Sequence, residues 1–299
     1  MSGAFDIGDA NAYAAWRERK LAYYPKSVSE LVVEVGDPRS LSTAERQAIL
    51  DRCRRANMAI YASGCGSDPD KQIPRRFGRQ LGLEHLDPNY LADDDGISPL
   101  TVAGTGGRGE YIPYTSRGIN WHTDGYYNRP ERRVRAFVLH CVQSAPEGGE
   151  NLLLDHEIAY LLLRDGNPEH VRALQEADAL TIPPRVESGR IERPAQSGAV
   201  FSVDSDGCLH MRYTARTVSI SWKDSAAMRD AVAALERLLA GSSSYVFRAR
   251  LEPGMGLVCN NILHNRSAFS DSPDRRRLIY RARYYERVTG TEDAGADPG

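Results

Sequence analysis

The sequence Trp121-His122-Thr123-Asp124-Gly125 lies in the part of the chain in which short β-type runs dominate. Side chains at positions i and i+2 of a strand project from the same face, so His122 and Asp124 would present an imidazole and a carboxylate side by side. Two histidines and one carboxylate on one face of an octahedral iron(II) ion leave three positions open for a cosubstrate and O2. An isolated His-x-Asp pair is common by chance, and its alternative is a turn or a hydrogen-bonded core histidine. The pattern predicts a metal site only if a second histidine lies nearby in space.

His264 is the strongest candidate for that second histidine, because it follows an expected strand at 256–260. The main rival is His156, which lies between two acidic residues. It stands at the expected start of a helix, however, where we expect a capping or surface role. We therefore predict a metal site formed by His122, Asp124 and His264.

Short β-branched and aromatic runs, separated by Gly, Pro, Asn and Asp, fill the chain from about residue 112 onward. They predict strands at 133–143, 198–203, 245–251, 256–260 and 278–285. Two helices are expected to interrupt these strands, at 156–165 and 225–239. The chain before them is expected to hold a helix from the cap at Ser42 to about residue 57, a strand at 58–62 and a helix at 75–83.

No internal repeat or low-complexity linker divides the chain. We expect one mainly β domain with helical decorations over residues 1–288. Its mixed α/β N-terminal part would cover 1–110 and its β core 111–288. The small, acidic segment 289–299 is expected to be a disordered tail.

A basic strand follows the candidate ligand His264. In the segment Arg275-Arg276-Arg277-Leu278-Ile279-Tyr280-Arg281-Ala282-Arg283-Tyr284 the residues alternate with period two, so Arg277, Arg281 and Arg283 would share one face. An arginine held inside a β core needs an anionic partner, and a carboxylate that accepts two hydrogen bonds is the natural one. The alternative is a solvated basic edge. The apolar residues on both sides favour an internal anion site.

Composition limits the classes of function. The 299-residue chain has 41% hydrophobic and 26% charged residues, a formal net charge of -2 and no apolar run long enough to cross a bilayer. Nucleic-acid-binding proteins usually carry a basic excess, so we expect neither a nucleic acid nor a membrane as partner. The first residues lack the layout of a secretory signal, and five cysteines without C-x-x-C spacing indicate reduced thiols. We therefore expect a cytoplasmic protein.

The segment Gly104-Thr105-Gly106-Gly107-Arg108-Gly109 matches the dinucleotide-binding pattern G-x-G-x-x-G. That pattern requires a helix directly after it, whose N-terminus faces a pyrophosphate. The residues that follow, with Pro113 and several aromatic side chains, are not typical of a helix. We interpret 104–118 as a loop that could close as a lid over the site of His122.

Four motifs together resemble the taurine/2,4-D dioxygenase-like (TauD/TfdA) superfamily of iron(II)- and 2-oxoglutarate-dependent oxygenases, which is related to clavaminate and carbapenem synthases. They are WHTDG at 121–125, EGGEN at 147–151, LHNRSAF at 263–269 and RRRLIYRAR at 275–283. The likeness covers roughly residues 111–287, and the order and approximate spacing of the motifs agree. The resemblance implies a double-stranded β-helix, which is a jelly-roll, cupin-like barrel with the metal at its mouth.

The resemblance also implies roles for the basic residues. The iron ligands would be the three residues named above, and Arg277 would bind the distal carboxylate of 2-oxoglutarate. Asn151 stands where the family usually has a threonine that hydrogen-bonds this cosubstrate. Arg281 matches an arginine that contacts either the anionic group of the substrate or the C1 carboxylate of 2-oxoglutarate. Arg266 resembles a substrate-facing position of the carbapenem synthase branch.

The resemblance implies a dioxygenase that uses Fe(II), 2-oxoglutarate and O2 to oxidise a C–H bond, by default through hydroxylation, with release of succinate and CO2. Tyr126, Tyr127 and Asn128, close to the site in sequence, suggest with the arginines a small anionic substrate. An amino acid or amino-acid-like metabolite is expected, although the two tyrosines have packing in the core as an alternative. A homo-oligomer is possible. The alternatives are a cupin-like metal-dependent hydrolase or isomerase, and a non-catalytic binding protein on the same barrel.

Overall fold

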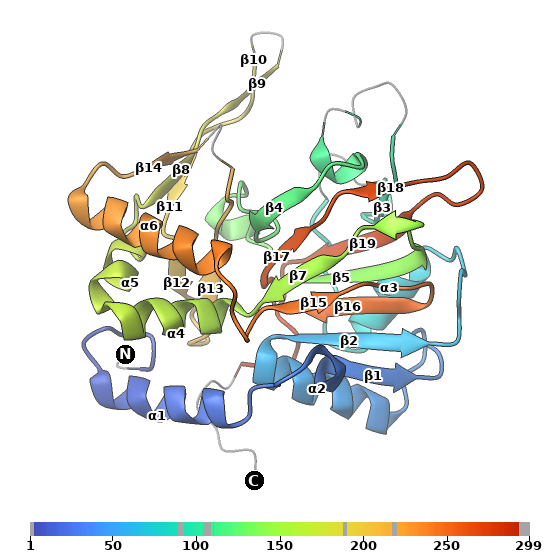
Figure 1. The fold of residues 1–299 in the computed structure, drawn as a ribbon, viewed down its shortest axis with the longest axis horizontal. Coiled ribbons are helices and arrows are strands. Elements are labelled where there is room, and N and C mark those ends of the chain that lie inside the picture. The colour runs from blue at the N-terminus through green and yellow to red at the C-terminus, as the bar shows by residue number, and fades with distance from the viewer. Residues whose placement is uncertain are drawn as a thin grey trace.

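Two sheets that face each other form the centre of the fold in this computed structural model, which describes residues 3–88, 93–103, 109, 111–187, 190–216 and 220–292 (Figure 1). The larger sheet has the order β1 (Val32–Val35), β2 (Met58–Ser63), β16 (Met255–Cys259), β5 (Ala136–Gln143), β19 (Leu278–Tyr284) and β3 (Ser98–Leu100). The smaller sheet has the order β15 (Phe247–Ala249), β7 (Asn151–Leu154), β17 (Leu263–Arg266) and β4 (Ile119–His122). Strands distant in sequence are neighbours in both sheets, as a jelly roll requires.

The strands of the larger sheet are buried on both faces, because each face packs against a different layer. Met58 and Ile60 of β2 point toward the smaller sheet and join its core. Ala59 and Tyr61, one residue out of phase, point the other way and pack on the helices of the outer face. Burial on both faces explains why β5 reads as a nearly continuous apolar run in the sequence.

Helices cover the sheets and extend the molecule to one side. Contacts place α2 (Thr43–Ala56) and α3 (Gln72–Arg79) on the larger sheet. A separate layer contains α4 (His156–Gly166), α5 (Pro168–Leu174) and α6 (Ala226–Ala240), and Figure 1 shows α1 (Ala10–Ala22) below it.

Short elements complete the fold. Their bounds are β6 (Glu147–Gly148), β8 (Leu180–Ile182), β9 (Arg185–Glu187), β10 (Arg190–Arg193), β11 (Gln196–Gly198), β12 (Phe201–Val203), β13 (Leu209–Met211), β14 (Ser221–Trp222), β18 (Phe269–Ser270), η1 (Val28–Leu31), η3 (Ile112–Tyr114) and η4 (Pro130–Arg132). The hairpin β9–β10 projects beyond the rest of the fold at the top of Figure 1.

The mainly β fold with helical decorations is confirmed. The cap at Ser42 forms a complete capping box with Glu45, and Asn57 ends this helix in a left-handed conformation, which positions β2. Helix α3 begins and ends earlier than expected. Strand β12 is the shortened form of the strand expected at 198–203.

Three expectations concern residues at the edge of the described chain. Residues 104–108 and 110 lie outside the described residues, and so does most of the G-x-G-x-x-G segment and part of the expected lid. In the expected tail, Thr291 is buried and donates a hydrogen bond to the carbonyl of Val288, whereas residues 293–299 lie outside the described part.

All five cysteines are free thiols. None of the described helices combines the length and apolar character that crossing a membrane requires.

Candidate active site

The three predicted metal ligands lie together between neighbouring strands of the smaller sheet. His122 at the end of β4 and His264 in β17 are direct cross-strand partners, and their ring centroids lie 4.2 Å apart. One donor atom each from His122, Asp124 and His264 lies within 4.8 Å of the other two. This spacing allows the three groups to bind one ion.

Hydrogen bonds from behind orient both imidazoles. The Nδ1 atom of His122 lies 2.9 Å from the carbonyl of Asn120, and that of His264 lies 3.0 Å from the carbonyl of Ile262. A carbonyl only accepts, so each Nδ1 donates and each Nε2 keeps its lone pair for a metal. Burial, reinforced by the nearby His264, lowers the pKa of His122 to about 3, and burial also lowers the pKa of His264. Both rings are therefore neutral near pH 7, as metal binding requires.

Asp124 is held as a buried carboxylate. Burial alone would raise its pKa, but the guanidinium groups of Arg281 and Arg283 outweigh this effect and keep the pKa below its usual range. Arg281 donates to Oδ1 of Asp124 over 3.1 Å, while Oδ2 is buried without a hydrogen-bond partner. An unpartnered buried carboxylate oxygen is costly, and a bound cation would satisfy it. The donor set and this oxygen fit a divalent metal.

Asn261 fixes the backbone on which Asp124 is carried. Its side chain accepts from the Asp124 amide over 2.8 Å and donates to the carbonyls of Asp124 and Val134. Asn261 has a left-handed backbone with φ 51°, a conformation that asparagine tolerates well. The sequence analysis missed this residue, and the asparagine pair 260–261 at the end of β16 was the available signal.

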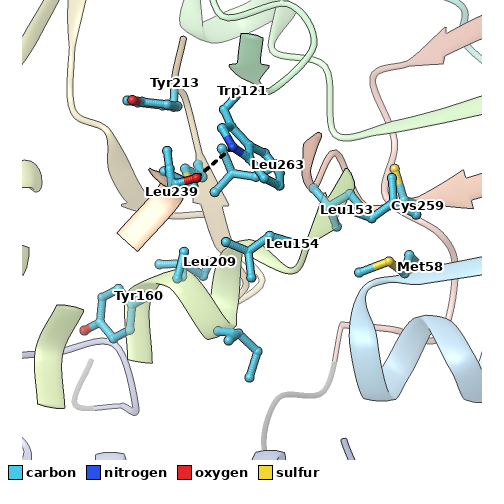
Figure 2. Packing of buried hydrophobic residues seen from close by; sticks show 14 of the residues in the cluster. Met58, Trp121, Leu153, Leu154, Tyr160, Leu209, Tyr213, Leu239, Cys259 and Leu263 are labelled. Atoms are coloured by element: carbon cyan, nitrogen blue, oxygen red, sulfur yellow. Dashed lines mark hydrogen bonds between the residues drawn. The ribbon is translucent and has the colours of Figure 1, made fainter. Parts of the chain in front are cut away.

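Trp121 anchors the strand that carries His122. Its side chain points away from the site into the core beside Leu263, and its indole N–H donates to the carbonyl of Leu239 over 3.1 Å, which Figure 2 draws as a dashed line. Because successive side chains of a strand point to opposite faces, a fixed Trp121 fixes the direction of His122.

Arg277 and Asn151 line one small cavity, together with Gly149 and Arg250. Arg277 is 5% exposed, burial lowers its pKa to about 10, and its Nη1 atom has no hydrogen-bond partner. Asn151 is likewise buried. A buried guanidinium with a free N–H group beside an amide fits the carboxylate end of a cosubstrate.

Glycines keep this cavity open. Gly148 and Gly149 have φ values of 71° and 75°, which L residues with a side chain rarely adopt. A Cβ at Gly149 would lie 3.4 Å from Nε of Arg277, and one at Gly148 would lie 2.1 Å from the Ala268 carbonyl oxygen. The backbone turn beside Arg277 therefore requires the two glycines of the motif EGGEN.

The remaining predicted residues lie in two places. Arg266 is buried, stacks 4.8 Å over Phe269 and donates to the carbonyl of Thr115 over 2.8 Å, so it ties the loop after η3 to β17. Its role toward substrate stays a prediction. Arg281 and Arg283 share the inner face of β19, as the alternation predicted, and Arg283 forms an ion pair with Asp87.

The segment after Asp124 forms the other group. The rings of Tyr126 and Tyr127 meet edge to face at 5.2 Å, and the Tyr127 hydroxyl accepts from Arg283 over 3.0 Å. Asn128 donates to the carbonyl of Arg132 over 2.8 Å, which closes the turn. Three cations that the sequence analysis did not identify, Arg185, Arg193 and Arg216, lie around these tyrosines or beside Tyr111.

His156, the rival ligand, lies away from this site. It is the first residue of α4, where Asp155 provides the cap, and it is 1% exposed. Its Nε2 atom lies 3.0 Å from the carbonyl of Leu209. The expected capping or surface role is wrong, because this histidine packs in the core between α4 and β13.

Comparison with protein families and curated proteins gives consistent matches. Residues 23–283 match the family described as taurine catabolism dioxygenase TauD, TfdA family. A uridine-5'-phosphate dioxygenase of Amycolatopsis sp is 32% identical over 178 residues, which span 58% of this chain and 62% of that protein. A uridine-5'-phosphate dioxygenase of Streptomyces sp is 30% identical over 227 residues, covering 70% of this chain and 76% of the relative.

Solved structures of the same fold include two oxygenases. An asparagine oxygenase in complex with Fe(II), 3-hydroxyasparagine and succinate has a TM-score of 0.56 at 14% identity, covering 85% of this chain and 93% of its own. The non-haem iron oxygenase OrfP with Fe and α-ketoglutaric acid has a TM-score of 0.60 at 18% identity, covering 95% and 92% of the two chains. These likenesses support the jelly-roll fold.

Proposed function

The chain belongs to the TauD, TfdA family and is a non-haem Fe(II)- and 2-oxoglutarate-dependent dioxygenase, and we propose that its substrate is a nucleoside 5'-phosphate of the uridine-5'-phosphate class. The observation that carries the substrate proposal is the pairing of tyrosine rings with arginines beside the metal ligands. The two curated relatives, both named for uridine-5'-phosphate, point in the same direction.

Within this proposal, His122, Asp124 and His264 hold the iron. The neutral imidazoles and the unpartnered oxygen of Asp124 support this assignment. When bound, iron and 2-oxoglutarate supply with O2 the oxidising equivalents for hydroxylating a C–H bond, with succinate and CO2 as coproducts.

Arg277 and Asn151 receive the distal carboxylate of 2-oxoglutarate in the proposed arrangement. The unpartnered Nη1 of Arg277 supports this role, because a guanidinium and a carboxylate form paired, charge-assisted hydrogen bonds. Arg281 keeps Asp124 ionised and orients it through the 3.1 Å hydrogen bond.

The substrate side of the site has the chemistry of a nucleotide. Tyr111, Tyr126 and Tyr127 are half-buried aromatic rings, and stacking on aromatic side chains is a common way to bind a base. Arginine is the preferred partner of phosphate because its planar fork donates two parallel hydrogen bonds. An amino acid, the substrate expected from the sequence, would bind through its carboxylate to the same arginines.

The test is succinate release by the iron-loaded enzyme with 2-oxoglutarate and O2. Uridine-5'-phosphate should stimulate succinate release well above the uncoupled rate. The same assay should include uridine and a panel of amino acids. Stimulation by an amino acid but not by any nucleotide would reject the proposed substrate class and favour the alternative.

The rival classes are separated by an anaerobic titration. Fe(II) followed by 2-oxoglutarate should develop a weak visible charge-transfer band. A folded, metal-loaded protein without that band would favour a hydrolase or isomerase, for which Arg277 has no cosubstrate to bind. A protein that binds metal and nucleotide but never forms succinate would favour a non-catalytic binding role.

A further inference from the structure

We propose that Arg185 and Arg193, an arginine pair on the hairpin β9–β10, form the binding site for the substrate's phosphate group. The inference rests on the proposed function, and it assigns the anion to residues that neither the motifs nor the basic strand β19 contains.

The two arginines lie directly opposite each other across the hairpin. Strands β9 and β10 are antiparallel, with Arg185 and Arg193 as Cα partners and Val186 and Ile191 as the next pair. Like charges at directly opposite positions destabilise a hairpin. A bound dianion between the two guanidinium groups would reverse the sign of this interaction.

In this hairpin the apolar side chains point to solvent and the arginines point to the protein, which is the reverse of an ordinary surface hairpin. Val186 and Ile191 occupy one face and are 55% and 67% exposed. On the other face Arg185 lies 5.1 Å from the ring centroid of Tyr111, and Arg193 lies 5.8 Å from that of Tyr127. The two cations therefore face Tyr111 and Tyr127, and the apolar pair faces solvent.

Arg193 has no carboxylate to neutralise it. It donates to the carbonyls of Pro183 over 2.9 Å and Pro194 over 3.4 Å, and in the described part of the chain no acidic side chain forms an ion pair with it. Burial lowers the pKa of Arg193, and the nearby Arg185 acts in the same direction. A bound anion would offset both the burial of this cation and its repulsion by the like charge.

The two arginines on the inner face of β19 already have carboxylate partners. Arg281 pairs with Asp124 at 3.1 Å, and Arg283 pairs with Asp87. The exposed Arg216 lies 3.4 Å from the Tyr126 hydroxyl and stands as a third cation at the same tyrosine pair. Beside the tyrosine pair, Arg193 and Arg216 therefore carry positive charge without a carboxylate partner among the described residues.

The experiment compares anaerobic binding of uridine-5'-phosphate and of uridine to the protein loaded with Fe(II) and 2-oxoglutarate. In the wild type the phosphate should tighten binding by at least about tenfold. In Arg185→Ala and Arg193→Ala the dissociation constant for uridine-5'-phosphate should rise about tenfold or more, while that for uridine stays constant. In the double variant the two ligands should bind with similar affinity.

Arg229→Ala is the matched control, because Arg229 is an exposed arginine of α6 paired with Asp224. It should leave both dissociation constants unchanged. A double variant that keeps the wild-type preference for the phosphate would overturn the arginine-pair site while leaving the proposed substrate class standing. A wild type that neither binds uridine-5'-phosphate nor releases succinate with it would overturn both.

Discussion

His264 contributes to the site through one nitrogen only, because its Nδ1 is held by the Ile262 carbonyl. We predict that His264→Ala abolishes tight Fe(II) binding, because only two of the three proposed ligands remain. The variant should stay folded. Equilibrium dialysis of Fe(II), with circular dichroism as the check on folding, measures this. His85→Ala is the control, because that side chain is 76% exposed. Retained tight iron in the His264 variant would disprove the ligand assignment.

Arg277 has an unpartnered donor in a small cavity, so its loss should act on the cosubstrate. We predict that Arg277→Ala raises the 2-oxoglutarate KM by about 10- to 100-fold, because a charge-assisted bidentate contact is worth roughly 1.5–3 kcal/mol. The neighbouring Arg275, 42% exposed, provides the control Arg275→Ala. If substrate binding collapsed while the 2-oxoglutarate KM stayed constant, the roles of Arg277 and Arg281 would be exchanged.

The candidate metal ligands could be predicted from sequence because a strand converts spacing of two into a shared face. The supporting residues could not be predicted. Asn261 acts on Asp124 from a distance of 137 positions in the chain, and Asp87 meets Arg283 across 196 positions. Neither pairing leaves a periodic signal, because each depends on how separate elements pack.

At the scale of elements, the turn between β6 and β7 should be the most sensitive to an added methyl group. Gly149→Ala would force alanine into φ 75° and bring Cβ to 3.4 Å from Arg277. We predict a loss of about 1–2 kcal/mol of unfolding free energy and weaker 2-oxoglutarate binding. Urea unfolding and the KM measure the two effects.

Gly166→Ala is the matched control for this turn. Gly166 ends α4, and a Cβ there would meet no atom within 4 Å. Alanine should leave stability equal or slightly higher. Equal effects of the two substitutions would contradict the conformational argument for Gly149.

The elements with strong periodicity were predicted well, and those without it were not. Helix α6 and strand β19 carry clear apolar patterns. Helix α1 was missed because its buried residues are Trp16 and Lys20, a combination that gives no apolar stripe. The hairpin β9–β10 was missed because Arg185 and Arg193 face inward and its apolar pair faces outward.

At the scale of the whole molecule, a buried ion cluster joins the two ends of the described chain to the helical layer. Lys20 of α1 lies 2.6 Å from both Asp155 and Glu157, and Arg287 lies 3.8 Å from Glu157. We predict that Lys20→Met costs about 3–5 kcal/mol of unfolding free energy, because it removes the cation that lies 2.6 Å from both buried carboxylates. Unfolding in urea should remain one transition if the chain is the single domain that the sequence predicts.

The same helix provides the control for this cluster. Arg17 and Asp165 form an ion pair whose side chains are 43% and 31% exposed. Arg17→Ala should cost less than about 1 kcal/mol, because solvent screens exposed pairs. A similar cost for both variants would show that burial of the Lys20 cluster contributes little.

Stability should also depend on pH through the buried His140. Burial lowers its pKa to about 4 from 6.5, so the unfolded chain takes up a proton between these values while the folded protein does not. The contribution of this residue to the free energy of unfolding is therefore fully present above pH 6.5. It is lost as the pH falls toward 4, by about 3 kcal/mol. His140→Gln should flatten the pH profile of urea midpoints in that window. An unchanged slope would contradict the assignment.

The hairpin β9–β10 separates two tasks that many active sites combine. The proposed ligands of iron and 2-oxoglutarate lie on β4, β7 and β17 or directly beside β4 and the start of β19, whereas the proposed phosphate pair lies on a hairpin outside both sheets. Changes in this hairpin during evolution could thus alter which substrates the enzyme accepts without disturbing the oxidative chemistry. For protein engineering, the same hairpin is the natural place to introduce a new substrate specificity.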